Sequence, residues 1–204
     1  MTMQITTLDD LTALYKPTNP NSLNKETASL TPAYRRWIER APFFAIATSG
    51  PGGLDCSPRG DAIGQAFRVL DDATIAIPDR RGNNRLDTLK NIIHDPRVAL
   101  LFLTPGIDET VRINGQATIS TDPELVDSFA VDGTLPATVI VVAMEAVYFQ
   151  CARALKRARL WEPDMQIDRD QVPSAGEMTK GALPGFDAED YDAKLQDRQA
   201  KSLY

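Results

Sequence analysis

The chain has 204 residues, 43% of them hydrophobic, two cysteines, and a formal net charge of −6 at pH 7. A chain of this length buries about 70% of its unfolded surface, so one main domain is expected to fold without a disulfide or a metal. No apolar run approaches the roughly 18 residues that a membrane-spanning helix needs, and the N-terminus lacks the basic start and apolar core of a secretory signal. These features predict a soluble cytoplasmic protein.

The residue inventory excludes several classes of site. Cys56 and Cys151 lie far apart and His94 is the single histidine, so a metal site of ordinary zinc-ligand spacing is not expected. The chain has no GxSxG sequence of a serine hydrolase, no GxxxxGK(S/T) phosphate loop and no strand-borne GxGxxG motif. Hydrolase, P-loop and Rossmann functions are therefore not expected.

Charge is unevenly distributed along the chain. Residues 162–204 hold ten acidic and five basic side chains, which accounts for −5 of the net charge of −6. In the remaining, nearly neutral part, basic side chains gather in two short stretches, residues 80–85 and 153–159. A chain without a wide basic surface does not favour nucleic-acid binding, whereas two local basic stretches favour a small anionic ligand.

The first part of the chain predicts two helices and a loop. A helical spacing of leucines stops at Pro17, so residues 1–30 are expected to form a helix followed by a loop. Thr31 is placed to cap a second helix, which Pro42 ends.

The hydrophobic pattern then changes to the two-residue period of strands. The expected strands are residues 43–49, 54–63, 66–78 with a tight connection at Asp71 and Asp72, 97–105, 110–120 and 137–149. Between them, Asn83 and Asn84 are expected to cap an amphipathic helix that ends at Asp95, and Asp122 to open a short helix.

Two helical patterns follow the last expected strand. Residues 151–161 predict a basic helix, and residues 187–202 predict a charged helix within the acidic tail. Antiparallel strands with sparse helices between them are typical of a small closed β-barrel rather than of a parallel βαβ sheet. We therefore expect a mainly β fold with helices (α+β).

Three parts are expected along the chain. Residues 1–30 form an N-terminal arm of helix and loop, residues 31–161 form the barrel domain, and residues 162–204 form an acidic C-terminal arm with a helix.

The loop that follows the strand at residues 75–77 is a candidate phosphate site. Its charged and amide residues are Asp79, Arg80, Arg81, Asn83, Asn84 and Arg85. Backbone N–H groups at a helix start, together with forked arginine side chains, suit the oxygens of a phosphate. The alternative is a polar loop whose arginines are solvated.

The basic helix is a second candidate. Arg153, Arg157 and Trp161 are spaced four residues apart, so they share one face of the expected helix. Such a face could close over a flat anionic cofactor, with Trp161 against its ring. The alternative is a solvated basic face with a buried Trp161.

Residues 57–61, Ser-Pro-Arg-Gly-Asp, form a third candidate. Pro58 removes a hydrogen-bond donor from the strand, and Gly60 permits the close approach of a ligand or another backbone. A flat ring could lie against this strand. The alternative is an edge strand with a bulge and no ligand.

Four motifs occur in a fixed order. They are Ser57-Pro58-Arg59-Gly60-Asp61; Ile77-Pro78-Asp79-Arg80-Arg81-Gly82-Asn83-Asn84-Arg85; Glu109-Thr110-Val111-Arg112-Ile113-Asn114-Gly115 after Pro105-Gly106; and Cys151-Ala152-Arg153-Ala154 before Leu160-Trp161. Together they resemble the pyridoxamine 5′-phosphate oxidase-like FMN-binding proteins, and look most like a bacterial branch of them. The resemblance spans roughly residues 31–161. It implies a six-stranded antiparallel split β-barrel that forms a homodimer and binds two FMN at the subunit interface.

The resemblance also implies roles for single residues. Residues 57–61 would face the isoalloxazine ring, residues 80–85 would hold the phosphate, and Arg112 would lie near the dimer contact. The basic helix would reach the flavin from the partner subunit. The implied cofactor-binding residues are Ser57, Pro58, Arg59, Gly60, Asp61, Ile77, Pro78, Asp79, Arg80, Arg81, Asn83, Asn84, Arg85, Arg112, Arg153, Arg157 and Trp161.

Two departures from the family pattern narrow the function. The oxidase itself recognises its substrate with a C-terminal Arg-x-His arrangement, and residues 197–204 contain no histidine, so vitamin B6 oxidation is not expected. The branch carries His-Cys before the basic helix and Arg-Ser within it, where this chain has Gln150-Cys151 and Arg157-Ala158. These changes would remove polar contacts to the ligand.

The expected function is that of an FMN-dependent oxidoreductase acting on a small substrate, to which the protein supplies position and electrostatics. No catalytic residue is assigned. Two alternatives stay open: a non-catalytic FMN-binding or flavin-buffering protein, and a split barrel that binds another anionic ligand.

Overall fold

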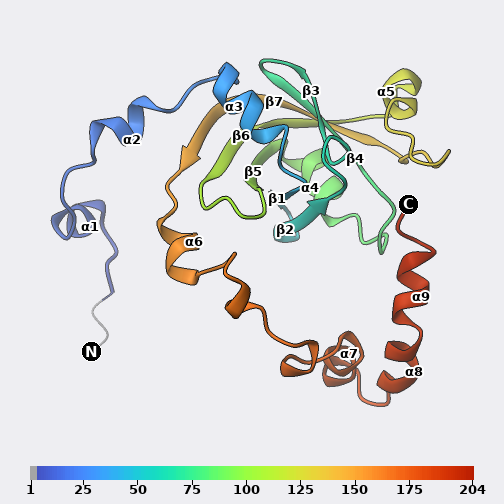
Figure 1. Ribbon diagram of the computed structural model, residues 1–204. Helices are drawn as coiled ribbons and strands as arrows, with labels where there is room; N and C mark the ends of the chain where they lie inside the picture. The colour runs from blue at the N-terminus through green and yellow to red at the C-terminus, as the bar shows by residue number, and fades with distance from the viewer. Residues whose placement is uncertain (1–3) are drawn as a thin grey trace.

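The computed structural model describes residues 4–204, so residues 1–3 of the predicted N-terminal arm lie outside it. Its centre is one antiparallel sheet in the order β2-β1-β5-β6-β7-β4-β3 (Figure 1). The strands are β1 (Phe43–Gly50), β2 (Gly53–Gly60), β3 (Arg68–Asp71), β4 (Thr74–Pro78), β5 (Arg97–Leu103), β6 (Thr110–Ser120) and β7 (Val139–Gln150). The predicted antiparallel pairing and mixed α+β class are confirmed.

The sheet has seven strands where the family resemblance implied six. The shortest strand is β3, which has four residues and pairs with β4 across the turn predicted at Asp71 and Asp72. The strand expected over residues 54–63 ends at Gly60, because Asp61 turns the chain: its Oδ1 accepts from the N–H of Ala62 at 2.7 Å.

Short helices precede, separate and follow the strands along the chain. They are α1 (Leu8–Ala13), α2 (Pro20–Asn24), α3 (Pro32–Ile38), α4 (Asp87–His94), α5 (Pro123–Asp127), α6 (Arg153–Ala158), α7 (Ala175–Ala182), α8 (Ala188–Ala193) and α9 (Leu195–Ala200), with 3-10 turns η1 (Pro163–Met165) and η2 (Arg169–Gln171). Within residues 4–204, no helix has the length and apolar character needed to cross a membrane.

Two predicted helices differ in extent. The basic helix expected over residues 151–161 ends at Ala158, because Arg159 takes a left-handed conformation with φ 52°. The helix expected over residues 187–202 is divided into α8 and α9 at Lys194. Trp161 therefore does not share a helix face with Arg153, and that part of the prediction is wrong.

The main hydrophobic core is formed by buried side chains of β1, β4, β5, β6 and β7, together with Ile38 of α3 and Ile92 of α4. Phe44, Phe67 and Phe102 pack together, with ring centroids 4.9 to 6.0 Å apart. Ile92 of α4 is buried against this cluster, and α4 packs on β1. This packing holds the start of α4 at a fixed place beside β1 and β2.

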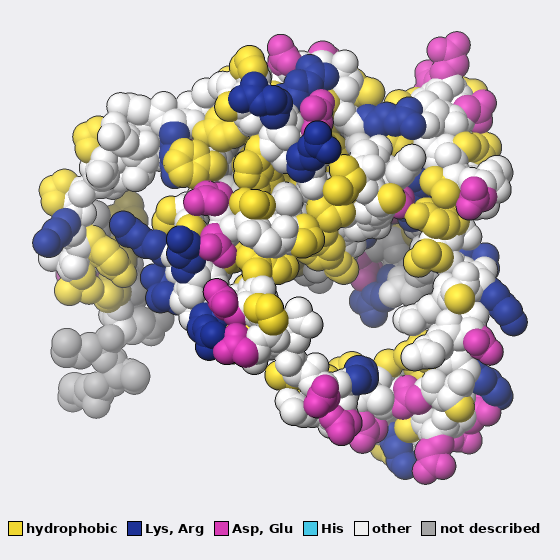
Figure 2. All heavy atoms as spheres, viewed as in Figure 1, with side chains coloured by type: hydrophobic (Ala, Val, Ile, Leu, Met, Phe, Trp, Pro, Cys, Tyr) yellow, Lys and Arg dark blue, Asp and Glu magenta, His cyan; other side chains and the backbone are white. Residues whose placement is uncertain are grey.

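Two segments extend beyond the sheet. Helices α1 and α2 lead away on one side and contain no buried residue. The chain from α6 to α9 runs in an arc and brings the C-terminus back toward the sheet (Figure 1). Figure 2 shows acidic side chains gathered over the lower part of this arc, and an open space between the arc and the body. The division into residues 1–30, 31–161 and 162–204 stays a prediction.

Candidate functional site

Strand β2 forms one wall of the candidate site. It is an edge strand that pairs only with β1, so its other edge has no partner strand among the described residues. An edge tolerates Pro58, which has no N–H, and the register there runs without a bulge. Since successive side chains alternate across a strand, Asp55, Ser57 and Arg59 share one face.

The loop between β4 and α4 forms the opposite wall. Asn83 and Asn84 do not cap α4, which corrects the prediction: the capping position is taken by Leu86, and Asn83 Oδ1 accepts instead from the N–H of Arg85 at 3.1 Å. Asn84 and Leu86 have left-handed φ values of 58° and 60°. Because no side chain caps α4, N–H groups of its first turn remain available to an anion.

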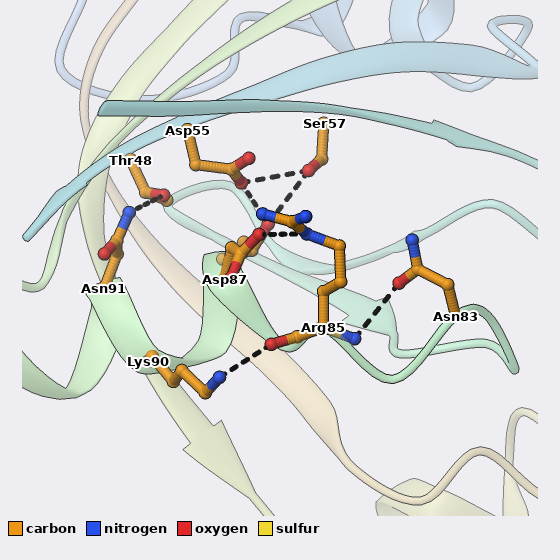
Figure 3. A network of polar contacts seen from close by, with 9 residues as sticks. Thr48, Asp55, Ser57, Asn83, Arg85, Asp87, Lys90 and Asn91 are labelled. Carbon is orange, nitrogen blue, oxygen red and sulfur yellow. Dashed lines mark hydrogen bonds and ion pairs between the residues drawn. The ribbon is translucent and has the colours of Figure 1, made fainter. Parts of the chain in front are cut away.

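A network of hydrogen bonds holds this loop and α4 against β2 (Figure 3). Asp55 Oδ2 accepts from Thr88 Oγ1 at 2.6 Å and from Ser57 Oγ at 2.9 Å. Arg85 Nε donates to Asp87 Oδ2 at 2.7 Å. The start of α4 is thus tied to the edge strand, although the two are about 30 positions apart in the sequence.

A cavity of about 660 Å³ opens where β2, the loop after β4 and the C-terminal residues meet. Its volume falls within the roughly 300–1,000 Å³ typical of small-molecule sites. The predicted residues that line it are Ser57, Pro58, Arg59, Gly60, Asp61, Pro78, Arg80, Arg81 and Asn83. A smaller cavity of about 210 Å³ shares several of these residues and adds Asp79, Asn84 and Arg85. The structure therefore brings the first and third predicted candidates together.

A buried ion pair joins the two walls. Arg80 Nε donates to Asp61 Oδ2 at 3.0 Å, and the side chains are 16% and 2% exposed. Arg80 Nη1 donates to the carbonyl oxygen of Phe129 at 2.6 Å. Arg80 Nη2 and Arg59 Nε are also buried, and neither has a hydrogen-bond partner within the described chain.

The charge of the larger cavity is positive. Arg59, Arg80 and Arg81 line it, and the carboxylate on its wall, Asp61, is already paired with Arg80. Asp79, on the smaller cavity, lies 3.7 Å from Arg59. Burial raises the pKa of Asp79 above its ordinary value, and the nearby Arg59 charge acts in the opposite direction.

Some predicted residues lie away from both cavities. Ile77 is fully buried in the core. Arg112 is exposed on β6, where its Nη1 is 3.5 Å from Tyr148 Oη. Arg153 and Arg157 of α6 are exposed and line neither cavity.

The position of α6 follows from contacts with the loop between β5 and β6. Trp161 Nε1 donates to the carbonyl oxygen of Ile107 at 2.9 Å, and Lys156 Nζ lies 3.9 Å from Asp108. Within one chain, the second predicted candidate is thus separate from the other two.

Sequence reasoning missed several residues of the site. Thr88 binds Asp55, and Leu203 and Tyr204 line the larger cavity. Tyr204 Oη donates to Asp61 Oδ1 at 2.7 Å across a separation of 143 positions. No local pattern could have placed the end of the chain there.

The model of one protein family, pyridoxamine 5′-phosphate oxidase, matches residues 30–151. This match includes all seven strands and the loop that carries the arginines. No curated protein matches the chain.

Three solved structures with different names illustrate what this chain is similar to. HupZ of Group A Streptococcus is 18% identical, over 58% of this chain and 91% of that one, with a TM-score of 0.48. General Stress Protein 26 of Bacillus anthracis is 15% identical. The match covers 56% of this chain and 88% of that one, with a TM-score of 0.44. An FAD-binding protein of Mycobacterium smegmatis is 14% identical. The match covers 61% of this chain and 97% of that one, with a TM-score of 0.43.

Proposed function

Because this chain belongs to the pyridoxamine 5′-phosphate oxidase family, we propose that it is an FMN-binding flavoprotein and an FMN-dependent oxidoreductase for a small substrate. The observation that carries the proposal is the 660 Å³ cavity between the edge strand β2 and the arginine-bearing loop. It combines a size suited to a cofactor with an excess of positive charge.

The residues present fit FMN, which joins a flat ring system to a phosphate. Arg59 Nε and Arg80 Nη2 are buried donors without a partner in the described chain, and an anion would supply the missing acceptor. We assign the phosphate to the arginine-bearing loop and the uncapped start of α4. The ring system is assigned to the wall formed by residues 57–61.

Bound FMN would supply the transfer of a hydride or of electrons. The protein's own residues bind, orient and balance charge. Arg59, Arg80 and Arg81 place positive charge where an anionic ligand must lie, and the Asp61–Arg80 pair holds one guanidinium in a fixed direction. No acid or base of the chain is given a catalytic role.

The proposal includes a homodimer with the split β-barrel fold of the family. Arg153, Arg157 and Trp161 lie away from the cavity of their own chain. In a dimer, α6 of one protomer would reach the cavity of its partner. The separation of the basic clusters within one chain supports a site built from two.

The first test is the visible absorption spectrum of the purified protein, before and after addition of FMN, and then with NADH or NADPH without oxygen. Flavin absorption that bleaches with a nicotinamide donor would support the oxidoreductase. Bound flavin that no such donor reduces would favour the non-catalytic alternative. A spectrum that stays empty after FMN is added would contradict flavin binding and favour another anionic ligand.

Replacing Arg85 tests the phosphate assignment. We expect Arg85→Ala to weaken FMN binding about ten- to hundredfold, because a hydrogen bond between a guanidinium and a phosphate is stronger than one between neutral groups. The matched control is Arg97→Ala, since Arg97 is similarly exposed and pairs with a carboxylate two positions away, outside both cavities. Equal affinity of the two variants, measured by flavin fluorescence, would contradict the assignment.

A further inference from the structure

The end of the chain takes part in the candidate site. Leu203 and Tyr204 line the 660 Å³ cavity, after a segment of more than forty residues that leaves the body at α6 (Figure 1). Tyr204 Oη donates to Asp61 Oδ1 at 2.7 Å, and the Arg80 guanidinium lies 5.5 Å from the centre of the Tyr204 ring. One side chain thus contacts both members of the buried ion pair.

Tyr204 completes the hydrogen bonding of Asp61. Oδ2 of this carboxylate accepts from Arg80, while Oδ1 accepts from Ala62 N–H and from the tyrosine hydroxyl. A tyrosine hydroxyl is protonated at neutral pH and can donate, and the hydrogen bond to Asp61 raises the pKa of Tyr204 further above its ordinary value. Tyr204 therefore helps to hold Asp61, and through it Arg80, in one orientation.

The ring of Tyr204 also lies in the larger of the two cavities. Tyr204 and Leu203 line the larger cavity but not the smaller one, which holds Arg85 and the start of α4. Apolar side chains of Pro58, Ala62 and Pro78 line the same larger cavity. This composition suits the flat ring system of a ligand rather than its phosphate.

We propose that Tyr204 is a ligand-binding residue of this cavity, whose ring packs against the flat ring system of the bound flavin and whose hydroxyl positions Asp61 and Arg80. The inference rests on the proposed function, since it names a residue of the same site. It assigns the C-terminal arm a role in binding.

The test compares FMN affinity and dissociation rate among variants. Tyr204→Ala removes the ring and the hydroxyl, and it is expected to raise the Kd about tenfold, mainly through faster dissociation. Tyr204→Phe keeps the ring and should lose only part of this effect. Tyr15→Ala is the control, because Tyr15 is 72% exposed on the N-terminal arm, outside both cavities.

Amide hydrogen exchange gives a second readout that needs no flavin. Residues 57–62 and 79–85 are expected to exchange faster in Tyr204→Phe than in wild-type protein, because the hydroxyl that holds Asp61 is gone. Unchanged exchange would overturn the positioning role of the hydroxyl.

The binding outcomes separate the inference from the proposed function. If wild-type protein binds FMN and Tyr204→Ala binds it with the same Kd and dissociation rate, the ring contact is wrong and the function stands. Tighter binding by Tyr204→Ala would mean that Tyr204 occupies the place of the ligand, which also overturns the inference. If wild-type protein does not bind FMN, the proposed function fails and the ring contact fails with it.

Discussion

Asp61 carries a carboxylate that is almost fully removed from water, and Arg80 balances its charge at 3.0 Å. Two further donors, Ala62 N–H and Tyr204 Oη, satisfy its other oxygen. A buried charge is tolerated only with such partners, because the loss of hydration has to be offset by Coulombic attraction and hydrogen bonds. The same pair fixes one of the guanidinium groups of the cavity, so these residues affect both stability and the geometry of the proposed binding site.

Asp61→Asn should lower the free energy of unfolding by about 3 kcal/mol, because it leaves the Arg80 charge buried without a counter-charge. Asp72→Asn is the control, since its pair with Arg35 is exposed and such pairs contribute about 0–1 kcal/mol. Urea unfolding of both variants gives the comparison. If Asp61→Asn lowers the free energy of unfolding no more than Asp72→Asn does, the result would be inconsistent with the buried pair.

Asp79 gives a prediction about pH. Burial raises its folded-state pKa above the ordinary value of 3.8, so the folded protein holds this proton more tightly than the unfolded chain does. Stability from this group is therefore present at low pH and is lost as pH rises from 3.8 through the folded pKa. Asp79→Asn should be more stable than wild-type protein at pH 7, with the difference vanishing below pH 3.8. Urea unfolding across this pH range tests the sign, and a difference that grows on acidification would refute it.

Strands β6 and β7 form the longest pairing of the sheet, and it contains one irregularity. The register shifts between Asn114 and Gly115, where the two backbones approach closely. A Cβ atom at Gly115 would overlap the carbonyl oxygen of Ala143. Glycine is needed there because the neighbouring atom belongs to a backbone that is itself held in the ladder.

Gly115→Ala is expected to lower the free energy of unfolding by about 3 kcal/mol, the upper part of the range for overpacked sites. Gly52→Ala should change it by less than about 1 kcal/mol, because nothing lies within 4 Å of the added Cβ. Thermal and urea unfolding of the two variants test this contrast. Similar stability of both would show that the β6–β7 bulge can relax.

At the scale of the whole molecule, the two basic clusters, residues 80–85 and residues 153–159, lie apart. The loop after β4 and the edge strand β2 face the cavity, while α6 is held by the loop between β5 and β6. The arc from α6 to α9 leaves an open space beside the body (Figure 2). In the proposed homodimer, a twofold axis would make the contacts reciprocal, and α6 of each protomer is proposed to serve the cavity of the other.

Mixed dimers test this arrangement. One variant carries Arg81→Ala with Arg85→Ala, and the other carries Arg153→Ala with Arg157→Ala. Each variant alone should bind FMN weakly, because both of its sites are damaged. Co-expression should yield mixed dimers with one intact site, and hence one FMN per dimer at wild-type affinity. If the mixed dimers have no site that binds FMN with wild-type affinity, the result would contradict a site shared between protomers.

Much of this architecture follows from local pattern. Strand-like hydrophobic runs predicted the seven strands: most were found from a two-residue period, and β7 from its content of Val and Ile. The arginine-bearing loop was also found locally, since strand, loop and helix are contiguous. Helix ends were less accurate: Asn83 was expected to cap α4, but it binds the backbone of Arg85 instead.

What the sequence determined by itself was the class of fold, the order of the strands along the chain, and the arginine and Ser-Pro-Arg-Gly-Asp motifs that point to a family. Only the tertiary structure decided that β2 is an edge strand, that Asp61 pairs with Arg80, and that Tyr204 returns to the same cavity. The reason is physical. Backbone periodicity is local, whereas the burial of a charge and its partners depends on which distant segments pack together.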